Sequence, residues 1–208
     1  KSDNAFAKAV IKVLPTILAD NLVKYYLNGS QFHVKVIDGS GNPIVNTNVS
    51  MNINGVFYVR QTNSEGIATL NIKLWSGKYI LTVHNPYDGL LKSFDVTVLP
   101  TIESNDLVKY YHNDSQFYAK FVDGAGNPLV NTKVKFNING VLYTRETNGE
   151  GVAKLNINLN PGEYILTSIH PNGLQVGKKV TVLPTLEGSD LTMNYKDGSQ
   201  FKARLVDG

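Results

Sequence analysis

The chain repeats its own sequence, and this feature constrains its fold more than any other. The string Val-Leu-Pro-Thr begins at Val13, Val98 and Val182, a spacing of roughly 85 residues. Between these marks the two copies agree at roughly 60% of positions up to Pro86 and Pro171, which chance does not produce. The predicted organisation is the final strand of a preceding repeat at 1–16, complete repeats at 17–100 and 101–184, and the first strands of a following repeat at 185–208.

Each repeat is patterned for β-strands separated by tight turns. An Asn-Gly pair at 54–55 and again at 139–140 is typical of a type I′ hairpin, because both residues tolerate positive φ. About seven short strands in such a repeat is the number typical of an immunoglobulin-like β-sandwich. We therefore expect an all-β chain of tandem immunoglobulin-like sandwiches. Apolar and polar residues alternate with period two at 34–36, 49–53, 70–74 and 96–98.

The alternation also predicts which side chains enter the core. Phe32, Val34 and Val36 are expected to point inward, and His33 and Lys35 outward, because successive strand residues face opposite sides of a sheet. The other inward positions are predicted to be Ile53, Leu70, Ile72, Leu74, Tyr79, Leu81, Val96 and Val98, with Asn71 and Lys73 outward.

The joints between repeats are short. A predicted strand runs into Pro100, which fixes one dihedral, and the next repeat opens at Thr101 with no Gly-rich or Ser-rich run between. Such joints favour an elongated, semi-rigid rod. The incomplete repeats at 1–16 and 185–208 contain strands whose edges need partners. We expect neighbouring repeats, or copies of the chain joined head to tail, to complete them.

Composition argues against several classes of function. The net charge is +3, and the lysines and arginines are scattered singly, so nucleic-acid binding is not expected. The lack of cysteine excludes a disulfide scaffold and thiol chemistry. No run in this segment reaches the length of a membrane span. No phosphate loop or other cofactor motif occurs, so no cofactor is expected.

The sequence contains no recognisable catalytic constellation, and an enzyme is not predicted. The four histidines, His33, His84, His112 and His170, occupy four different positions of the repeat, which excludes a shared catalytic base. We expect them at the surface.

Acidic residues recur in the turns. Asp38, Asp123 and Asp207 each precede a glycine, and such a loop could bind calcium through carboxylate and backbone oxygens. Each loop offers one carboxylate where a tight site needs several, and Asx turns explain the same residues. The turn interpretation is favoured, and no metal site is predicted.

Lys24 and Lys109 are candidates for a self-formed isopeptide cross-link, which joins a buried lysine to a buried Asn or Asp. The third copy has Met193 at the matching position, so the repeat does not require lysine there. The favoured alternative is a surface lysine beside half-buried tyrosines.

Three triplets fit the Asn-x-Ser/Thr pattern of N-glycosylation, at Asn28, Asn48 and Asn113. Asn28 and Asn113 share one repeat position, in a predicted turn where a glycan could be accommodated. Tyrosines such as Tyr25, Tyr26 and Tyr58 could form a binding face, but core packing explains most of them.

Four motifs together carry a family resemblance. They are Lys-Tyr-Tyr-x-Asn-x-Ser-Gln-Phe, Asp-Gly-x-Gly-Asn-Pro, Asn-Ile-Asn-Gly-Val-x-Tyr-x-Arg and Pro-Gly-x-Tyr-Ile-Leu-Thr. With them the chain resembles the Ig-like repeats of adhesin-like surface proteins of methanogenic archaea, over essentially its whole length. The first repeat departs from the last motif, with Ser76 before Gly77. The resemblance implies an extracellular, cell-surface location and a role in attachment or cell-envelope structure.

The function expected from these features is structural, as a stalk or fibre segment of a surface protein. Near-identity of the repeats favours a shaft. The alternative is a module that binds glycans or a partner cell directly, and an accessory domain of an enzyme ranks third. A binding module is expected to carry an exposed cluster in one repeat that the other lacks, and the sequence does not reveal one.

Overall fold

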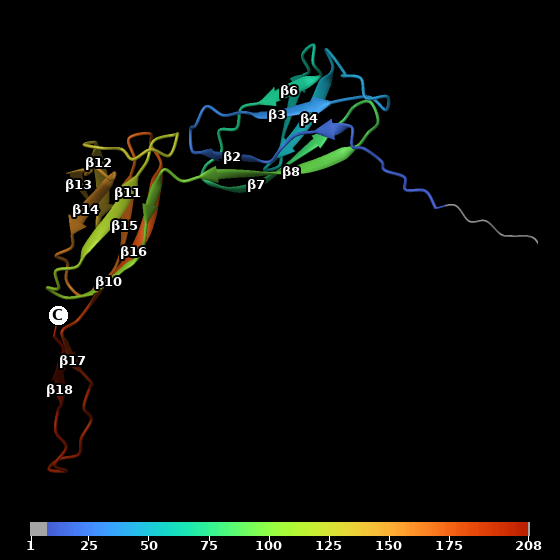
Figure 1. Ribbon diagram of the computed structural model, residues 1–208. Helices are drawn as coiled ribbons and strands as arrows, with labels where there is room; N and C mark the ends of the chain where they lie inside the picture. Colours follow the sequence, from blue (N-terminus) through green and yellow to red (C-terminus); the bar gives the residue numbers. More distant parts are fainter. Residues whose placement is uncertain (1–7, 208) are drawn as a thin grey trace, which may run out of the picture. The chain divides into compact units, whose positions relative to one another are not determined.

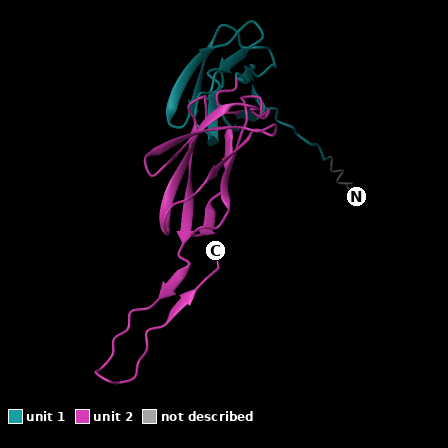
Figure 2. Cartoon of the chain, turned by 90° about the vertical axis from the view of Figure 1, so that its left-hand side faces the viewer, with its two compact units in different colours: residues 1–24, 29–98 teal, residues 25–28, 99–208 magenta. Residues whose placement is uncertain are grey.

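The computed structural model describes residues 8–207, in which eighteen strands and no helix occur (Figure 1). This described part of the chain accordingly offers no helix that could cross a bilayer. The chain divides into two compact units, residues 1–24 with 29–98 and residues 25–28 with 99–208 (Figure 2). The prediction of an all-β fold is confirmed.

The first eight strands form one sandwich of two sheets. The smaller sheet has the order β1-β3-β6 and the larger has the order β2-β8-β7-β4-β5. The strands are β1 (Ile17–Leu18), β2 (Leu22–Tyr25), β3 (Phe32–Val36), β4 (Asn48–Ile53), β5 (Val56–Gln61), β6 (Ile67–Leu70), β7 (Gly77–His84) and β8 (Leu91–Leu99).

The next eight strands repeat this architecture. Their sheets have the orders β14-β11-β9 and β10-β16-β15-β12-β13, which match the first sandwich strand for strand. The strands are β9 (Ile102–Ser104), β10 (Leu107–Tyr110), β11 (Gln116–Phe121), β12 (Lys133–Ile138), β13 (Val141–Glu146), β14 (Val152–Asn156), β15 (Gly162–Ile169) and β16 (Gln175–Leu183).

Each sandwich has eight strands, where the sequence indicates about seven, because the opening segment is divided between the sheets. β9 pairs antiparallel with β11, whereas β10 pairs parallel with β16 in the opposite sheet. Two packed, mostly antiparallel sheets with strands shared in this way form an immunoglobulin-like sandwich.

The hairpin turns are as predicted. β4 and β5 are joined by Asn54 and Gly55 alone, with φ angles of 54° and 76°. Asn139 and Gly140 join β12 and β13 with φ of 53° and 78°. Positive φ at both turn residues defines type I′, whose twist matches that of the flanking strands.

The core follows the predicted alternation. Phe32, Val34 and Val36 of β3 are at most 1% exposed, whereas His33 is exposed and Lys35 is half-buried. The facing sheet supplies Val49, Met51, Ile53, Leu81, Val83, Val96 and Val98, all buried.

Residues 70–74 do not form the predicted strand. β6 ends at Leu70, although Ile72 is still buried and Leu74 is half-buried. Tyr79, also predicted to be inward, is half-buried, and its hydroxyl donates to the Trp75 carbonyl at 2.9 Å. The strand prediction was wrong because the Ile72 carbonyl has a side-chain partner instead of a neighbouring strand, as described below.

The joint threonine belongs to the sandwich that follows it. β8 ends at Leu99, immediately before the proline, and Thr101 is fully buried. Its carbonyl accepts from the Val122 N–H at 3.1 Å, and its hydroxyl accepts from Asn172 Nδ2 at 3.2 Å. These bonds fix the start of the second sandwich to its own loops.

The two terminal segments differ. Residues 8–15 contain no strand in the structure, and the rest of the predicted opening strand lies on 1–7, outside the described residues. At the other end, β17 (Leu186–Gly188) pairs antiparallel with β18 (Ala203–Leu205). This pair has the register of β9 with β11, so the strand pair that opens a sandwich recurs there. The repeat boundaries themselves stay a prediction.

Candidate functional site

Two buried lysines are the most unusual feature of the sandwiches. Lys24 in β2 and Lys109 in β10 are each only 4% exposed, so the expectation of surface lysines was wrong. Lys24 Nζ donates to the carbonyls of Ser30 at 2.8 Å and Ile72 at 3.1 Å. The lysine therefore ties β2 to the segment that follows β6 in the other sheet.

Lys109 repeats this arrangement with one more partner. Its Nζ donates to the carbonyls of Asn113, Ser115 and Ile157, the last two at 3.2 and 3.0 Å. An ammonium has three N–H donors, and three backbone acceptors satisfy all of them.

The hydrogen bond from Lys24 to Ile72 also explains why the strand does not continue after Leu70. The carbonyl of Ile72 is buried after β6 has ended, and a buried carbonyl without a partner is destabilising by about 1–3 kcal/mol. Lys24 supplies the partner, so the chain can leave the sheet at this point. Burial lowers the pKa of Lys24 from its ordinary value, because desolvation disfavours the charged form.

The hydrogen-bond partners of Lys24 and Lys109 Nζ bear on the hypothesis of an isopeptide cross-link. Every hydrogen bond described for Lys24 and Lys109 Nζ goes to a backbone carbonyl, none to a side-chain amide or carboxyl group. The geometry gives these lysines a clear role as non-covalent ties, and the cross-link stays a prediction.

The three glycosylation candidates lie in different settings. Asn48 is exposed at the first residue of β4. Asn28 and Asn113 are half-buried in the turn after β2 and β10, and Asn113 Oδ1 accepts from the Ser115 N–H at 2.9 Å. Their occupancy stays a prediction.

In the aspartate loops, the carboxylate oxygens accept hydrogen bonds from residues of the same loop. Asp38 Oδ1 accepts from the N–H groups of Ser40 and Asn42 at 2.9 and 2.8 Å, and Oδ2 accepts from Asn42 Nδ2 at 3.1 Å. These bonds hold the pKa of Asp38 below its usual value, the Asn42 contacts contributing most. Asp123 makes the same bonds. Between residues 8 and 207, no group of three or more His, Cys, Asp or Glu side chains could hold a metal.

His170 departs from the prediction of surface histidines, because it is only 6% exposed. Its Nδ1 accepts from the Asn172 N–H, and its Nε2 lies 2.9 Å from the Val122 carbonyl. Since a backbone N–H can only donate, the ring is neutral with its proton on Nε2. In the first sandwich Asn85 takes this place, donating to the Ile37 carbonyl and accepting from the Tyr87 N–H.

A loss of stability in weak acid is expected from His170. Desolvation lowers its pKa in the folded state, so the unfolded chain binds the proton more tightly. Stability is therefore full above the unfolded pKa of about 6.5. It falls as the pH drops towards the lower folded pKa, by at most about 1.4 kcal/mol per pH unit.

The control for this effect is His170→Asn, which copies the residue of the first sandwich. Thermal unfolding measured from pH 8 to pH 4.5 should show a steeper acid loss in the unmodified chain than in the variant. Identical profiles would mean that protonation of His170 does not contribute, and that the carboxylates alone produce the acid response.

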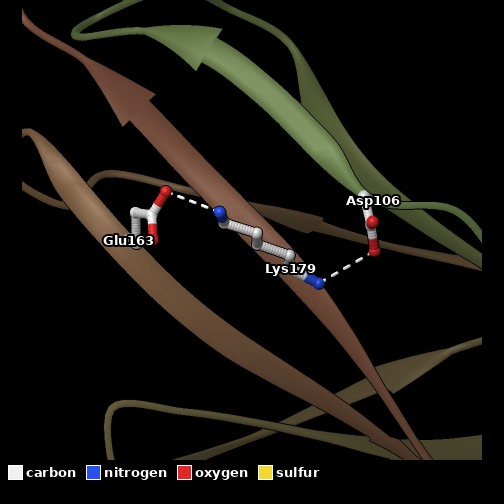
Figure 3. Close-up of polar contacts among 3 residues, drawn as sticks. All are labelled: Asp106, Glu163 and Lys179. Carbon is white, nitrogen blue, oxygen red and sulfur yellow. Dashed lines mark hydrogen bonds and ion pairs between the residues drawn. The ribbon is translucent and has the colours of Figure 1, made fainter.

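A surface ion pair marks the outer face of the larger sheet. Lys179 Nζ lies 2.5 Å from Glu163 Oε1, and the Lys179 N–H donates to Asp106 Oδ1 at 2.9 Å (Figure 3). The first sandwich has Lys78 and Asp95 at the matching positions, with the charges exchanged. Exposed pairs of this kind contribute at most about 1 kcal/mol, so they indicate a solvated sheet face and not a reactive site.

The comparisons with known proteins are distant. No protein-family model and no curated protein matches the chain. Invasin, a bacterial integrin-binding protein, is 16% identical with a TM-score of 0.34, covering 92% of this chain and 47% of invasin. SGBP-B of the Bacteroides ovatus mixed-linkage glucan utilization locus is 14% identical with a TM-score of 0.32, covering 88% of this chain and 51% of that protein. The titin Ig tandem A164-A165 is 12% identical with a TM-score of 0.29, covering 80% of this chain and 94% of the tandem.

This chain therefore spans about half the length of invasin and of SGBP-B. The fold assignment rests on the strands of the chain itself.

Proposed function

We propose that the chain is a structural segment of a stalk or fibre, within an adhesin-like protein displayed outside the cell. The sequence resemblance to surface-protein repeats of methanogenic archaea supports this proposal, as does the recurrence of the same sandwich with roughly 60% of positions unchanged up to Pro86 and Pro171. A shaft needs many similar links, whereas a recognition module needs one distinctive surface.

The observation that carries the proposal is the parallel pairing of β10 with β16. The chain enters the second sandwich through β9 and β10 and leaves it through β16, with Leu107 opposite Val180 and Tyr110 opposite Leu183. Pulling the two ends apart draws these parallel neighbours in opposite directions along their length. Their hydrogen bonds are then loaded together instead of one after another, which suits a link under tension.

Stretching single molecules between their two ends is expected to give two separate unfolding steps. Each step should lengthen the chain by somewhat less than about 280 Å, because a repeat of roughly 84 residues reaches that length when extended at 3.3 Å per residue and the folded repeat already spans part of it. Gradual lengthening at low force, without discrete steps, would contradict a load-bearing role.

Exposed apolar side chains in the segment 185–207 favour a partner that would cover them. Leu186, Phe201 and Leu205 are at least 60% exposed, whereas their counterparts in the second sandwich, Ile102, Phe117 and Phe121, are at most 2% exposed. Burying these side chains would stabilise the strand pair by the hydrophobic effect. Neighbouring repeats or a second copy joined head to tail are the proposed partners, and sedimentation of the chain over a range of concentrations tests the second of these.

Direct binding of glycans or of a partner cell is the second candidate function. It is favoured by a group of basic side chains, His33, Lys35 and Lys92, that line one surface of the first sandwich and are mostly replaced in the second.

A further inference from the structure

The first sandwich carries a basic depression whose lining residues are mostly different in the second sandwich. It lies on the outer face of the smaller sheet, has a volume of about 470 Å³, and is open to solvent. All three strands of this sheet and the segment after β1 contribute to its lining, and Lys92 of β8 lies at one side. The lining residues used below are Leu18, Asp20, His33, Lys35, Ile67 and Lys92.

The basic groups are held in place by contacts to the fold. Lys92 is half-buried, and its Nζ donates to the Ile17 carbonyl at 3.2 Å and lies 5.2 Å from the centroid of the Phe94 ring. His33 Nδ1 lies 3.0 Å from Thr69 Oγ1. Such contacts restrict the Lys92 and His33 side chains before binding, which reduces the side-chain entropy that a ligand must overcome.

The charge at this surface is positive. Lys35 and Lys92 outweigh Asp20 by one unit with His33 neutral, and the pairing puts Lys35 opposite Leu18 and Ile67. The apolar neighbours leave the Lys35 charge without an ionic partner across either strand. An anionic group placed here would meet two cations from different strands, while the aliphatic side chains contact the rest of the ligand.

The second sandwich has lost this arrangement residue by residue. Of the seven lining positions, only Lys35 keeps its identity, as Lys120, although the repeats agree at roughly 60% of positions up to Pro86 and Pro171. Lys120 lies opposite Glu103 in the strand register, so an acidic residue is its cross-strand neighbour where Lys35 has Leu18. His33 corresponds to Tyr118, and Lys92, by its place in the β7–β8 register, corresponds to Val176.

We propose that this depression of the first sandwich, defined by His33, Lys35 and Lys92, binds an anionic saccharide through its carboxylate or sulfate groups. A saccharide is favoured over an acidic peptide because the lining groups are side chains on a sheet face. Peptides recognised by sheets generally pair with a free strand edge, and the two edge strands of this sheet, β1 and β6, are only two and four residues long. This inference does not depend on the stalk role, because a shaft segment can also carry a ligand.

The test measures binding of defined probes to the full chain by isothermal titration calorimetry. The probes are a sulfated heparin hexasaccharide, a carboxylated oligogalacturonate, the neutral cellohexaose and a poly-glutamate peptide. One or both anionic saccharides should bind, with an affinity that falls as salt is added. Which of them binds distinguishes sulfate from carboxylate as the recognised group.

The second sandwich supplies matched variants for this test. The double variant His33→Tyr with Lys92→Val installs residues that the same fold already accepts, and it should weaken binding about tenfold or more. Lys120→Ala, in the second sandwich, should leave the affinity unchanged. Installing Tyr118→His with Val176→Lys should add a second, weaker site.

Three outcomes would overturn the proposal. They are equal binding of the double variant and the unmodified chain, no binding of either anionic saccharide beyond that of cellohexaose, and binding of poly-glutamate as tight as that of the saccharides. The last outcome would instead identify a site for acidic peptides. A failure of any kind here leaves the stretching experiment untouched, because that experiment measures the β10–β16 ladder and not this surface.

Discussion

Gly66→Ala is expected to lower the free energy of unfolding of the first sandwich by about 3 kcal/mol. Gly66 has a φ of 75°, a left-handed conformation that is unfavourable by about 1–2 kcal/mol for a residue with a Cβ. An added Cβ would also lie 2.8 Å from the Val36 carbonyl and 2.9 Å from Pro43 Cβ. Both contacts belong to the folded backbone or to a rigid ring, so neither can move aside easily.

Trp75 makes this loss measurable in the intact chain. It is the sole tryptophan of the sequence and lies in the first unit, so its fluorescence reports that unit separately. A loss of about 3 kcal/mol corresponds to a fall in melting temperature of about 15 °C for a domain of this size.

Gly55→Ala is the matched control for the steric effect. Gly55 has nearly the same φ, 76°, but an added Cβ there meets nothing within 4 Å. Only the conformational cost applies, so we expect a loss of about 1 kcal/mol. Equal losses for the two variants would show that the close approach to Val36 is unimportant.

Lys24→Met is expected to destabilise the first sandwich by about 2 kcal/mol, or about 10 °C in melting temperature. Two effects oppose each other. Removing the ammonium relieves the desolvation of a charge, but it leaves the carbonyls of Ser30 and Ile72 without their donor. A methionine side chain fills a similar volume, so the lost hydrogen bonds decide the sign.

An exposed lysine provides the comparison for this variant. Lys78 in β7 is exposed, and Lys78→Met should change the free energy of unfolding by less than about 0.5 kcal/mol. If Lys24→Met were neutral or stabilising, the ammonium would contribute no net tie between the sheets. Lys109→Met in the second sandwich should then also be neutral, which calorimetry of the second transition would show.

Local sequence determined much of the fold. The Asn-Gly pairs predicted both type I′ hairpins, because positive φ at two adjacent residues is a requirement that few residue types meet. The alternation at 32–36 gave the buried face of β3 correctly, since strand side chains alternate by geometry. The recurrence of the Val-Leu-Pro-Thr string predicted that the same sandwich occurs twice.

Contacts between segments that are distant in sequence decided which polar side chains are buried. Lys24 lies beside two tyrosines in sequence and looks like a surface residue, but its partner Ile72 is 48 residues away. His170 and Val122 are likewise 48 residues apart, so no local pattern marks that histidine as buried. A buried polar side chain is fixed by the acceptors that the folded backbone places around it, and those acceptors come from loops that are not adjacent in sequence.

The basic depression also combines a difference that is visible in the sequence with an arrangement that only the folded structure shows. Alignment of the repeats alone shows that His33 corresponds to Tyr118, a difference that looks like ordinary surface variation. Only the pairing of β1 with β3, and the reach of Lys92 from β8 in the other sheet to the Ile17 carbonyl, bring His33, Lys35 and Lys92 to one surface. The sequence by itself determined that the chain is a repeated β-sandwich, because strand periodicity and turn chemistry are local properties. The tertiary structure decided which cations are buried as ties and which face a ligand, because both depend on where distant strands meet.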